Sequence, residues 1–559
     1  MGFAVSYGAA YAVLFTILIL FTLLAFATTP FFSRLIPESV QALCCLKSKI
    51  DDEGDYFLSA RNSASAVAVG LSFFASGMGA WVLYASAELG ATPEISWIGV
   101  IGYSVSSAFP AIIISFIGPT IREMTSETNA FSTSDFARIR FGRLMQITVS
   151  LVSIFYMFIY ITAEFTSIMN VYRSITNDWG ASQKFGVSVT ISLGVFTVFY
   201  TTVAGLPASI ATDKFQALVI SVLVVLLLFA VTVYEDNQVS PEEFGVASNW
   251  TSDGVMVFVT LLIAIASAEM FNQGTWQRVW AAESIPAMRK GFYMGSAMVF
   301  FLMMFFGIFG MIAYAKNPTY NSSNAFLAFF DLLAPLPPFW HILTLILTTA
   351  LAASSVDSLQ NALTSVFSRD LVKLGWDPLL ITRFLVIGIN IPAVVLSVEG
   401  YSVLSLFLVA DLVCATSVFP LFLGMQKRDI GLLKAPTELG SIIGCFSGIV
   451  TVVVNGYVNG ANGGGIFDYF WLRNGAICPL CGSKTMVTFI IVPLVSAIFT
   501  YLGSFLDVTV RGERARSPLL ALKFDEDEKD LELDENFDDE TPEKLKVEDM
   551  DSVIAGEKE

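Results

Sequence analysis

Histidine and charge are both scarce in this chain of 559 residues. It has one histidine, His341, and only 14% of its residues are charged, whereas 55% are hydrophobic. A soluble protein needs more charge than this to cover its surface. A single histidine nearly excludes histidine-based metal sites and catalytic triads, and no nucleophile–base constellation of an enzyme is recognisable.

Nucleotide-binding motifs are missing as well. No stretch resembles a P-loop or a dinucleotide fingerprint. An ATP-driven pump is therefore not favoured, and an ion gradient is the expected driving force for any transport. Nothing in the sequence indicates a nucleic-acid partner or an organic cofactor.

The six cysteines do not indicate a disulfide scaffold. Cys44 and Cys45 follow the first apolar run and are either palmitoylated or simply small apolar residues. Cys478 and Cys481 lie in a CPLC loop, where a disulfide or no bond at all is equally compatible with the sequence. A zinc site there would need two more ligands, and none is present nearby.

The net charge of −17 is concentrated at the C-terminus. Residues 524–559 contain 17 acidic residues and 4 lysines, giving −13, so the rest of the chain carries only −4 (−17 minus −13). This composition is typical of a disordered, solvated segment. A solubilising tail is the simpler interpretation, and docking of a cytoplasmic partner is the alternative.

Long apolar runs dominate what remains, because a bilayer core about 30 Å thick requires roughly 20 apolar residues per helix. The sequence predicts an all-α membrane protein with about thirteen transmembrane helices. The first run is expected to be a retained helix, since no lysine or arginine precedes it as in a signal peptide. The predicted spans are 8–29, 64–86, 95–118, 145–171, 184–203, 210–234, 254–272, 291–315, 339–367, 377–398, 401–424, 437–456 and 485–506.

Basic residues predict the orientation of these spans. If the N-terminus is outside, twenty lysines and arginines fall on the cytoplasmic side and five on the outside. The positive-inside rule therefore favours an outside N-terminus and a cytoplasmic C-terminus, in what we expect to be the plasma membrane. The sequons at Asn249 and Asn321 both fall in predicted outside loops, which agrees with this topology and predicts a glycoprotein.

Two predicted spans are interrupted by residues that break helices. The second contains FASGMGAW (74–81), and the seventh, five spans later, ends in AEMFNQGTW (268–276). Interruptions at corresponding positions of two repeats are the best sequence indication of a transport site. The pattern predicts a 5+5 inverted-repeat core over spans two to eleven. The alternative is that the small residues only permit close helix packing.

Polar residues inside the spans supply candidate ligands. Ser354, Asp357, Ser358 and Asn361 share one face of the ninth span, and serine hydroxyls suit a hard cation. Serines can also bond back to their own helix, so the carboxylates are more informative. Asp357, Glu164 and Glu269 are each a functional candidate, with a structural hydrogen bond or ion pair as the alternative.

Four stretches resemble motifs of the solute:sodium symporter family, in the family's order. They are DYFLSARNS (55–63), YTTVAGLPASIATDKFQ (200–216), NQGTWQRVWAAESIPAMRKG (272–291) and SSVDSLQNALTSVFSRDL (354–371). The second is similar to the family's most specific motif, in which Thr-Asp-x-x-Gln opens a helix. Gly77 stands where proline-type members carry an acid, so the resemblance does not favour proline as the solute.

The resemblance implies an inverted-repeat transporter with a sodium site between the second and ninth spans. The implied sodium ligands are the backbone carbonyls of Ala75, Met78 and Leu351 and the hydroxyls of Ser354 and Ser355. Leu351 replaces the usual alanine, which matters little if only its carbonyl binds. Asp213 would lie near the ion's cytoplasmic exit. Sodium is thus the expected co-substrate.

The predicted function is sodium-coupled symport of a small organic solute by alternating access. The candidate solute ligands are Trp81, Glu164, Glu269, Asn272, Gln273 and Asp357. Three intramembrane acids favour an amine, amide or cationic solute, although they could instead carry protons, which makes a proton-coupled symporter the main alternative. A non-transporting sensor and a channel are the others.

The predicted domain organisation has four parts. An extra N-terminal helix and cytoplasmic loop occupy 1–63, and the transporter core occupies 64–424. Two further helices follow in 425–510, and the acidic cytoplasmic tail is 511–559.

Overall fold

The computed structural model describes a helical protein without β-strands in its described part. The described residues are 5–27, 59–126, 130–178, 183–320, 324–371, 378–399, 401–431, 433–458, 470 and 483–515. Four features predicted from the sequence lie outside these residues: the pairs Cys44/Cys45 and Cys478/Cys481, the sequon at Asn321, and residues 516–559 of the acidic tail.

Ten helices in the described part are long and apolar enough to cross a membrane. They are α1 (Tyr7–Ala27), α7 (Ser96–Met124), α9 (Arg143–Thr176), the two parts Lys184–Val203 and Gly205–Val233 of α10 (Lys184–Val233), α12 (Ser252–Glu269), α14 (Ile285–Lys316), α16 (Pro338–Leu371), α20 (Glu438–Val458) and α22 (Ser483–Arg511). Each coincides with a span predicted from the sequence.

Two further spans are bent pairs of helices. α5 (Ala66–Gly77) and α6 (Val82–Ala91) meet at 68°, and α18 (Val403–Ala415) meets α19 (Val418–Phe422) and the turn that follows it at 42°. The described structure therefore has ten to twelve membrane-spanning helices by length and composition. α17 (Pro378–Val398) occupies the remaining predicted segment as a shorter apolar helix. The prediction of an all-α membrane fold is confirmed.

Short helices join the spans at both ends. They include α8 (Thr133–Arg140), α11 (Pro241–Ala247), α13 (Gln273–Ala281) and α15 (Ala328–Leu333). The two parts of α10 join at Gly205, whose φ of 65° lies in the left-handed region that glycine adopts without strain. This turn separates the predicted spans 184–203 and 210–234.

The core spans form two groups of five in chain order. The first group is α5/α6, α7, α9 and the two parts of α10, and the second is α12/α13, α14, α16, α17 and α18/α19. The first member of each group packs against the second member of the other, as α5 does with α14 and α12 with α7. The third members, α9 and α16, pack against each other. The first and fifth members of each group are also in contact, α5 with α10 and α12 with α18. This exchange is the arrangement expected of a 5+5 inverted repeat.

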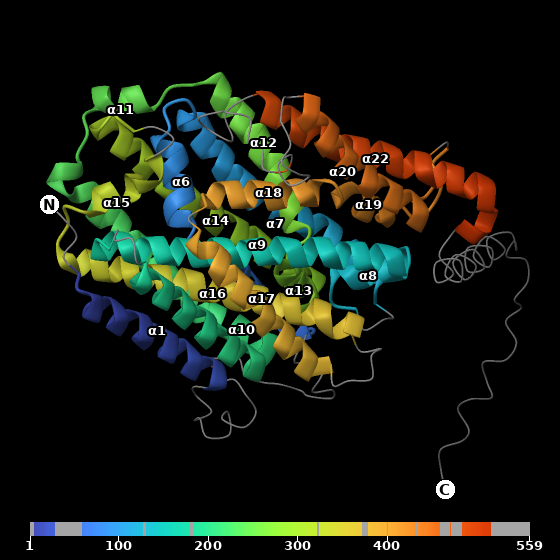
Figure 1. The fold of residues 1–559 in the computed structure, drawn as a ribbon, viewed down its shortest axis with the longest axis horizontal. Helices are drawn as coiled ribbons and strands as arrows, with labels where there is room; N and C mark the ends of the chain where they lie inside the picture. The colour runs from blue at the N-terminus through green and yellow to red at the C-terminus, as the bar shows by residue number, and fades with distance from the viewer. Residues whose placement is uncertain are drawn as a thin grey trace, which may run out of the picture.

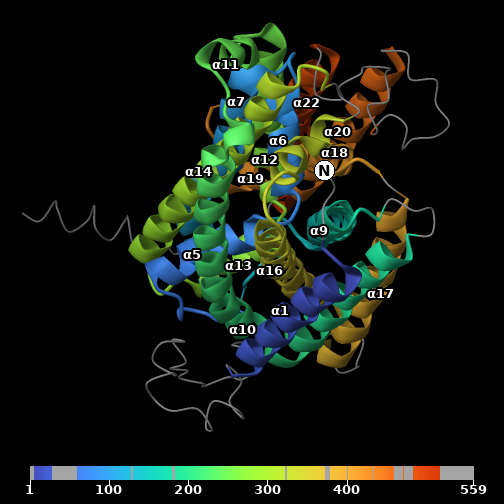
Figure 2. The same ribbon diagram turned by 90° about the vertical axis from the view of Figure 1, so that its left-hand side faces the viewer.

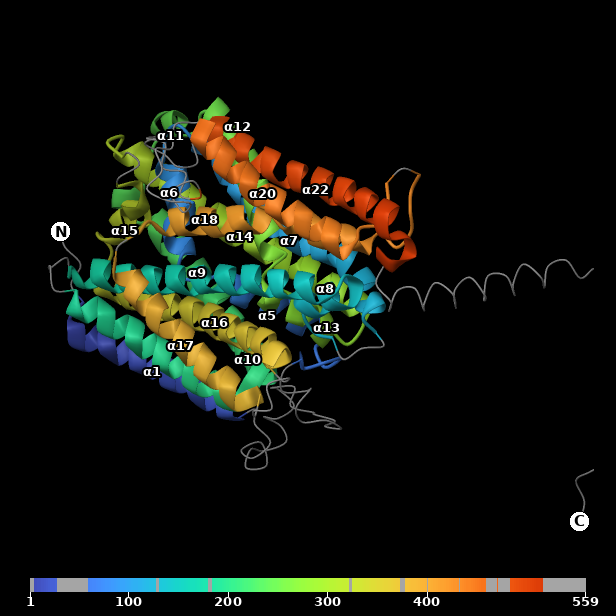
Figure 3. The ribbon, with the colours of Figure 1, turned by 45° about the vertical axis from the view of Figure 1, so that its right-hand side comes forward.

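Helices outside the repeats lie on opposite flanks of this core. α20 and α22 run side by side along one flank, and α1 runs along α10 on the other (Figure 1, Figure 3). In the view turned by 90°, α9, α16 and α5 lie between these flanks (Figure 2). α1 begins at the end of the molecule that carries α11 and α15, whereas α22 ends at the opposite end with α8 (Figure 1). The first and last long helices of the described part therefore begin and end at opposite ends of the molecule (Figure 1).

Glycines allow α6 and α14 to touch through their backbones. A Cβ added to Gly90 would lie 1.9 Å from the carbonyl oxygen of Gly307, and one added to Gly310 would lie 2.0 Å from that of Ala87. Backbone atoms on both sides leave no flexible side chain to move aside.

We expect Gly90→Ala to destabilise the protein by about 1–3 kcal/mol or more, because the two helices must move apart. Thermal unfolding of the purified protein measures this loss. Gly388→Ala is the matched control, since a Cβ there meets nothing within 4 Å. Equal unfolding temperatures for the two variants would contradict the close approach.

Candidate functional site

The first helix break exposes backbone carbonyls in the protein interior. α5 ends at Gly77, and Met78 after it is extended, with φ −104° and ψ 103°. In the described chain, no backbone N–H donates to the carbonyl oxygen of Ala75 or of Met78. Both oxygens are thus available to a ligand, which is what unwound helices provide in transport sites.

α16 supplies two buried hydroxyls near this break. Ser354 Oγ donates a hydrogen bond to Asp213 Oδ1 at 2.7 Å. Ser355 Oγ is buried and makes no hydrogen bond of ordinary geometry with the described residues. A buried polar atom without a partner is costly, so this hydroxyl is an open ligand position. The donors at Ala75, Met78, Leu351, Ser354 and Ser355 are all oxygens, which fits a hard cation such as sodium.

The second break lies between α12 and α13, at Met270–Asn272. Asn272 caps α13 by accepting the Thr275 N–H at 3.4 Å. It also donates through Nδ2 to the Glu269 carboxylate at 3.1 Å. Tyr156 and Thr275 donate to the same carboxylate, each at 3.0 Å. All three donors are neutral, so the Glu269 carboxylate is well oriented but its charge is not balanced by them.

A cavity lies between the two breaks. α5, α7, α9, α12 and α18 all contribute to its wall, together with residues of the first break. Its aromatic lining consists of Phe73, Trp81, Tyr103, Tyr156, Tyr160 and Phe407, and its carboxylates are Glu269 and Asp411. Among the described residues that line it, none is a lysine, arginine or histidine.

Asp411 is the less constrained of the two carboxylates. It is 5% exposed, and the structure gives it no hydrogen bond or ion pair within the described part of the chain. It lies near enough to Glu269 for the two to interact electrostatically. A buried and a half-buried acid beside one aromatic cavity form a site suited to positive charge.

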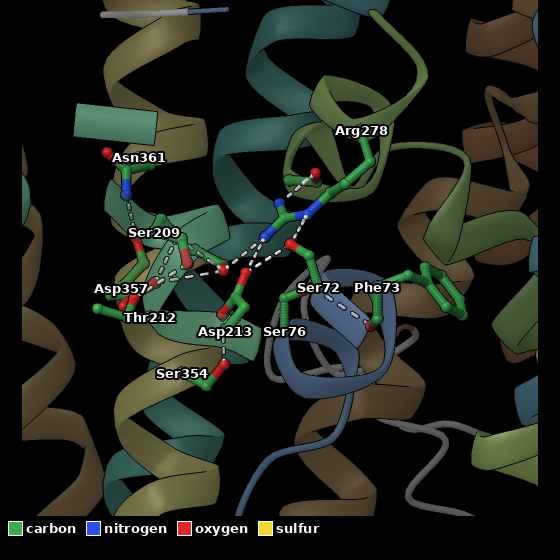
Figure 4. A network of polar contacts seen from close by, with 12 residues as sticks. Ser72, Phe73, Ser76, Ser209, Thr212, Asp213, Arg278, Ser354, Asp357 and Asn361 are labelled. Atoms are coloured by element: carbon green, nitrogen blue, oxygen red, sulfur yellow. Dashed lines mark hydrogen bonds and ion pairs between the residues drawn. The ribbon is translucent and has the colours of Figure 1, made fainter. Parts of the chain in front are cut away.

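A second polar cluster surrounds a buried ion pair between Asp213 and Arg278 (Figure 4). Arg278 Nη2 lies 2.9 Å from Asp213 Oδ2, and both side chains are fully buried. Ser72 donates to the same carboxylate oxygen at 2.5 Å and accepts from Arg278 Nε at 3.0 Å. Arg278 Nη1 donates to the Gly274 carbonyl at 2.5 Å. The pair therefore ties α5, α10 and α13 together.

Asp357 joins the same cluster from α16. Tyr200 OH donates to one of its oxygens at 2.8 Å and Ser209 Oγ to the other at 2.7 Å. Ser358 Oγ accepts from Arg278 Nη2 at 2.9 Å and lies 3.3 Å from Asp357 Oδ1. The polar face of α16 thus points toward α10 and Arg278 (Figure 4).

The structure separates the predicted solute ligands into four places. Trp81 and Glu269 line the cavity, and Asn272 orients Glu269. Glu164 accepts the Ala80 N–H at 2.9 Å beside the first break. Asp357 lies in the ion-pair cluster. Gln273 bonds Thr133 and, at 2.9 Å, Ser153. Their binding roles remain predictions, as do those of the sodium candidates.

Sequence reasoning did not single out Asp411, Tyr156, Tyr160 or Arg278. Asp411 carries the same signal as Asp357, a carboxylate inside an apolar run, and the same rule could have found it. The tyrosines carry no such signal, because aromatic residues are common throughout these helices. Only the fold brings Arg278 to Asp213, 65 positions away.

Known proteins match this chain in sequence and in fold. The spermidine transporter DUR31 of Candida albicans is 25% identical over 458 residues, covering 81% of this chain and 85% of the relative. Among solved structures, a Na⁺-coupled sialic acid symporter in a substrate-bound outward-open state aligns with a TM-score of 0.64 at 17% identity, over 89% of this chain and 98% of that one. MhsT in complex with L-phenylalanine aligns with a TM-score of 0.51 at 13% identity, over 78% of this chain and 99% of that one.

These structural matches show the inverted-repeat fold, and the relatives are transporters rather than enzymes. The sequence model of the sodium:solute symporter family matches residues 56–374, which begin before α5 and end after α16. That stretch contains the first helix break, the second helix break and the ion-pair cluster. This multi-pass membrane protein belongs to the sodium:solute symporter family.

Proposed function

We propose that the protein is a sodium-coupled symporter of a small organic amine, carried in its cationic form. The observation that carries the proposal is the cavity between the two helix breaks. Glu269 and Asp411 line it, and none of the described lining residues is basic. A buried carboxylate without a basic partner is costly, and a cationic solute would supply that partner.

The aromatic lining supports the same class of solute. Trp81 and Phe407 lie edge to face at 5.4 Å, and Tyr160 and Phe407 at 5.1 Å. Aromatic faces attract ammonium groups, and apolar walls accommodate the methylene chain of an amine. The name of the relative from Candida albicans, a spermidine transporter, points to amines as well.

Sodium is the coupling ion that the oxygen donors at the first break support. Carbonyls of Ala75, Met78 and Leu351 with the hydroxyls of Ser354 and Ser355 would hold it, and Asp213 would lie beside its path to the cytoplasm. Binding there would link α5 to α16 and favour the outward-open state. Rocking of one helix group against the other would then release ion and solute inside.

The proposed orientation places the N-terminus outside and the C-terminus in the cytoplasm of the plasma membrane. Sodium and a cationic solute then move in the same direction, toward the negative interior. A potential of about 100 mV contributes about 2.3 kcal/mol for each positive charge moved. Coupled transport of two charges would thus be strongly driven.

Uptake of labelled spermidine into proteoliposomes containing the full chain tests this function. We expect uptake against a concentration gradient with sodium outside, and at least tenfold less when choline replaces sodium at fixed pH. Undiminished uptake driven by a pH gradient would identify proton coupling instead. Flux that never exceeds equilibrium would indicate a channel, and binding without flux would indicate a sensor.

A further inference from the structure

A third buried carboxylate, Glu164 of α9, lies outside the proposed solute cavity. Its side chain is fully buried and is not among the residues that line that cavity. One oxygen, Oε2, accepts the Ala80 N–H at 2.9 Å. The other, Oε1, has no hydrogen-bond partner of ordinary geometry among the described residues.

Gly79 makes room for this carboxylate at the first helix break. A Cβ on Gly79 would lie 1.4 Å from Glu164 Oε1, so only glycine at this position allows the carboxylate to lie where it does. Gly79 directly follows Met78, whose carbonyl is a sodium candidate. The open oxygen of Glu164 is therefore directed at the unwound backbone itself.

The nearest hydroxyls do not satisfy Glu164 Oε1. Ser355 is its polar neighbour and interacts with the carboxylate, but neither Ser355 Oγ nor Glu164 Oε1 makes a hydrogen bond of ordinary geometry with a described residue. Tyr160 OH is engaged elsewhere: it donates to the Gly77 carbonyl at 2.7 Å and accepts from Trp81 Nε1 at 3.1 Å.

No basic side chain within the described residues forms an ion pair with Glu164. The ion pairs found in the described part of the chain do not include it. Arg278, the fully buried arginine of the core, is committed to Asp213, Ser72, Ser358 and the Gly274 carbonyl. An isolated buried carboxylate is far more costly than a neutral polar group, so a cation is the missing component.

We propose that Glu164 is an anionic ligand of the coupling sodium ion, acting with Ser355 Oγ and the carbonyls of the first break. The inference rests on the proposed sodium coupling and adds a charged ligand that the motif-based set of carbonyls and hydroxyls lacks. The bound ion would then link three elements: α9, the α5–α6 break and α16. The carboxylate of Glu164 would balance the positive charge of the sodium ion within the site, independently of the solute.

Sodium binding to the purified full chain tests this role without transport. Sodium is titrated against choline at constant ionic strength and pH, and the unfolding temperature is followed, because a ligand that binds the folded state stabilises it. Glu164→Gln keeps an oxygen that accepts the Ala80 N–H but removes the charge. We expect the sodium concentration for half-maximal stabilisation to rise about tenfold or more, since hydrogen bonds and contacts to charged groups are the stronger ones.

Three further variants separate this role from others. Ser355→Ala should weaken sodium binding, and adding it to Glu164→Gln should cost less than the sum of the single changes, because both groups would hold one ion. Glu242→Gln should leave the sodium dependence unchanged, since Glu242 lies exposed in α11 and lines neither the cavity nor the first break. If Glu164→Gln does not fold, Gly79→Ala replaces it, because a Cβ there would displace the Glu164 carboxylate; an unchanged sodium midpoint in that variant overturns the role of Glu164.

The outcomes distinguish this inference from the proposed function. If the wild type and Glu164→Gln reach half-maximal stabilisation at the same sodium concentration, the role of Glu164 is overturned and sodium coupling stays intact. A Glu164→Gln variant that binds sodium normally but loses amine affinity assigns Glu164 to the solute and also overturns it. Wild-type protein that sodium does not stabilise, and whose uptake ignores sodium, refutes the coupling itself.

Discussion

Glu269→Gln and Asp411→Asn should each lower amine uptake by about 30-fold to several thousand-fold at low solute concentration. Removing one partner of a buried charge pair costs about 2–5 kcal/mol, and about 1.4 kcal/mol corresponds to a factor of ten. Both side chains line the cavity that we assign to the solute, where Asp411 is buried and Glu269 is half-buried. Uptake of labelled spermidine into proteoliposomes, divided by the amount of folded protein, measures the effect.

The two variants should differ in their effect on folding. Glu269 accepts hydrogen bonds from three side chains. In Glu269→Gln the amide NH₂ replaces one of the accepting oxygens, so it would face a hydrogen-bond donor and leave that donor without an acceptor. No described residue bonds Asp411, so Asp411→Asn should fold at least as well as the wild type. Asp411→Asn is therefore the cleaner test of charge recognition.

Glu242→Gln provides the control, because Glu242 lies exposed in α11, away from the cavity. It removes one acidic charge from the protein surface and should leave uptake within about twofold, since exposed charges are screened by salt. A neutral amide of similar size provides the second comparison. If Asp411→Asn reduced uptake of the amide as much as that of spermidine, the charge would not be what the cavity recognises.

The lengths of the apolar runs and the residue types that interrupt them were sufficient to predict most of the fold. Each predicted span has a counterpart in the structure, because the bilayer imposes about 20 apolar residues on every crossing. The breaks at Met78–Trp81 and Met270–Asn272 were predicted from glycines and an Asn-Gln pair. The bend between α18 and α19 was not predicted, because 401–424 is one apolar run. Neither glycine nor proline interrupts this run at Thr416 and Ser417, where the two helices join.

The site was predicted less completely, because partners there come from distant parts of the chain. Asp357 and its serines do share one helix face, as the spacing predicted. That face, however, meets Tyr200, Ser209 and Arg278 rather than the cavity. Helical periodicity tells which residues lie together but not which neighbour they meet, and that depends on how ten or more helices pack.

The ion pair between Asp213 and Arg278 leads to the second large effect that we expect. Arg278→Gln should destabilise the folded protein by about 3–5 kcal/mol, because it leaves the Asp213 carboxylate buried without its cation. Ser72 and Ser354 still donate to Asp213, but two neutral hydroxyls do not replace a guanidinium. Thermal unfolding and the fraction of monodisperse protein in detergent measure the loss.

A double variant that neutralises both Asp213 and Arg278 is the informative comparison with Arg278→Gln alone. Asp213→Asn combined with Arg278→Gln removes both charges, so the double variant should recover part of the stability that Arg278→Gln loses. Lys434→Gln is the control for a pair near the surface: Lys434 lies 2.9 Å from Asp429, with side chains 31% and 23% exposed. Its loss should cost no more than about 1 kcal/mol.

Recovery in the double variant need not restore transport. Arg278 also holds Ser358 and the Gly274 carbonyl, and through them it fixes α16 and the start of α13 relative to α5. A stable but inactive double variant would show that the pair positions the moving helices, whereas an active one would assign it to stability alone. Without recovery of stability, the cost would lie in the lost hydrogen bonds of Arg278 rather than in the unpaired charge of Asp213.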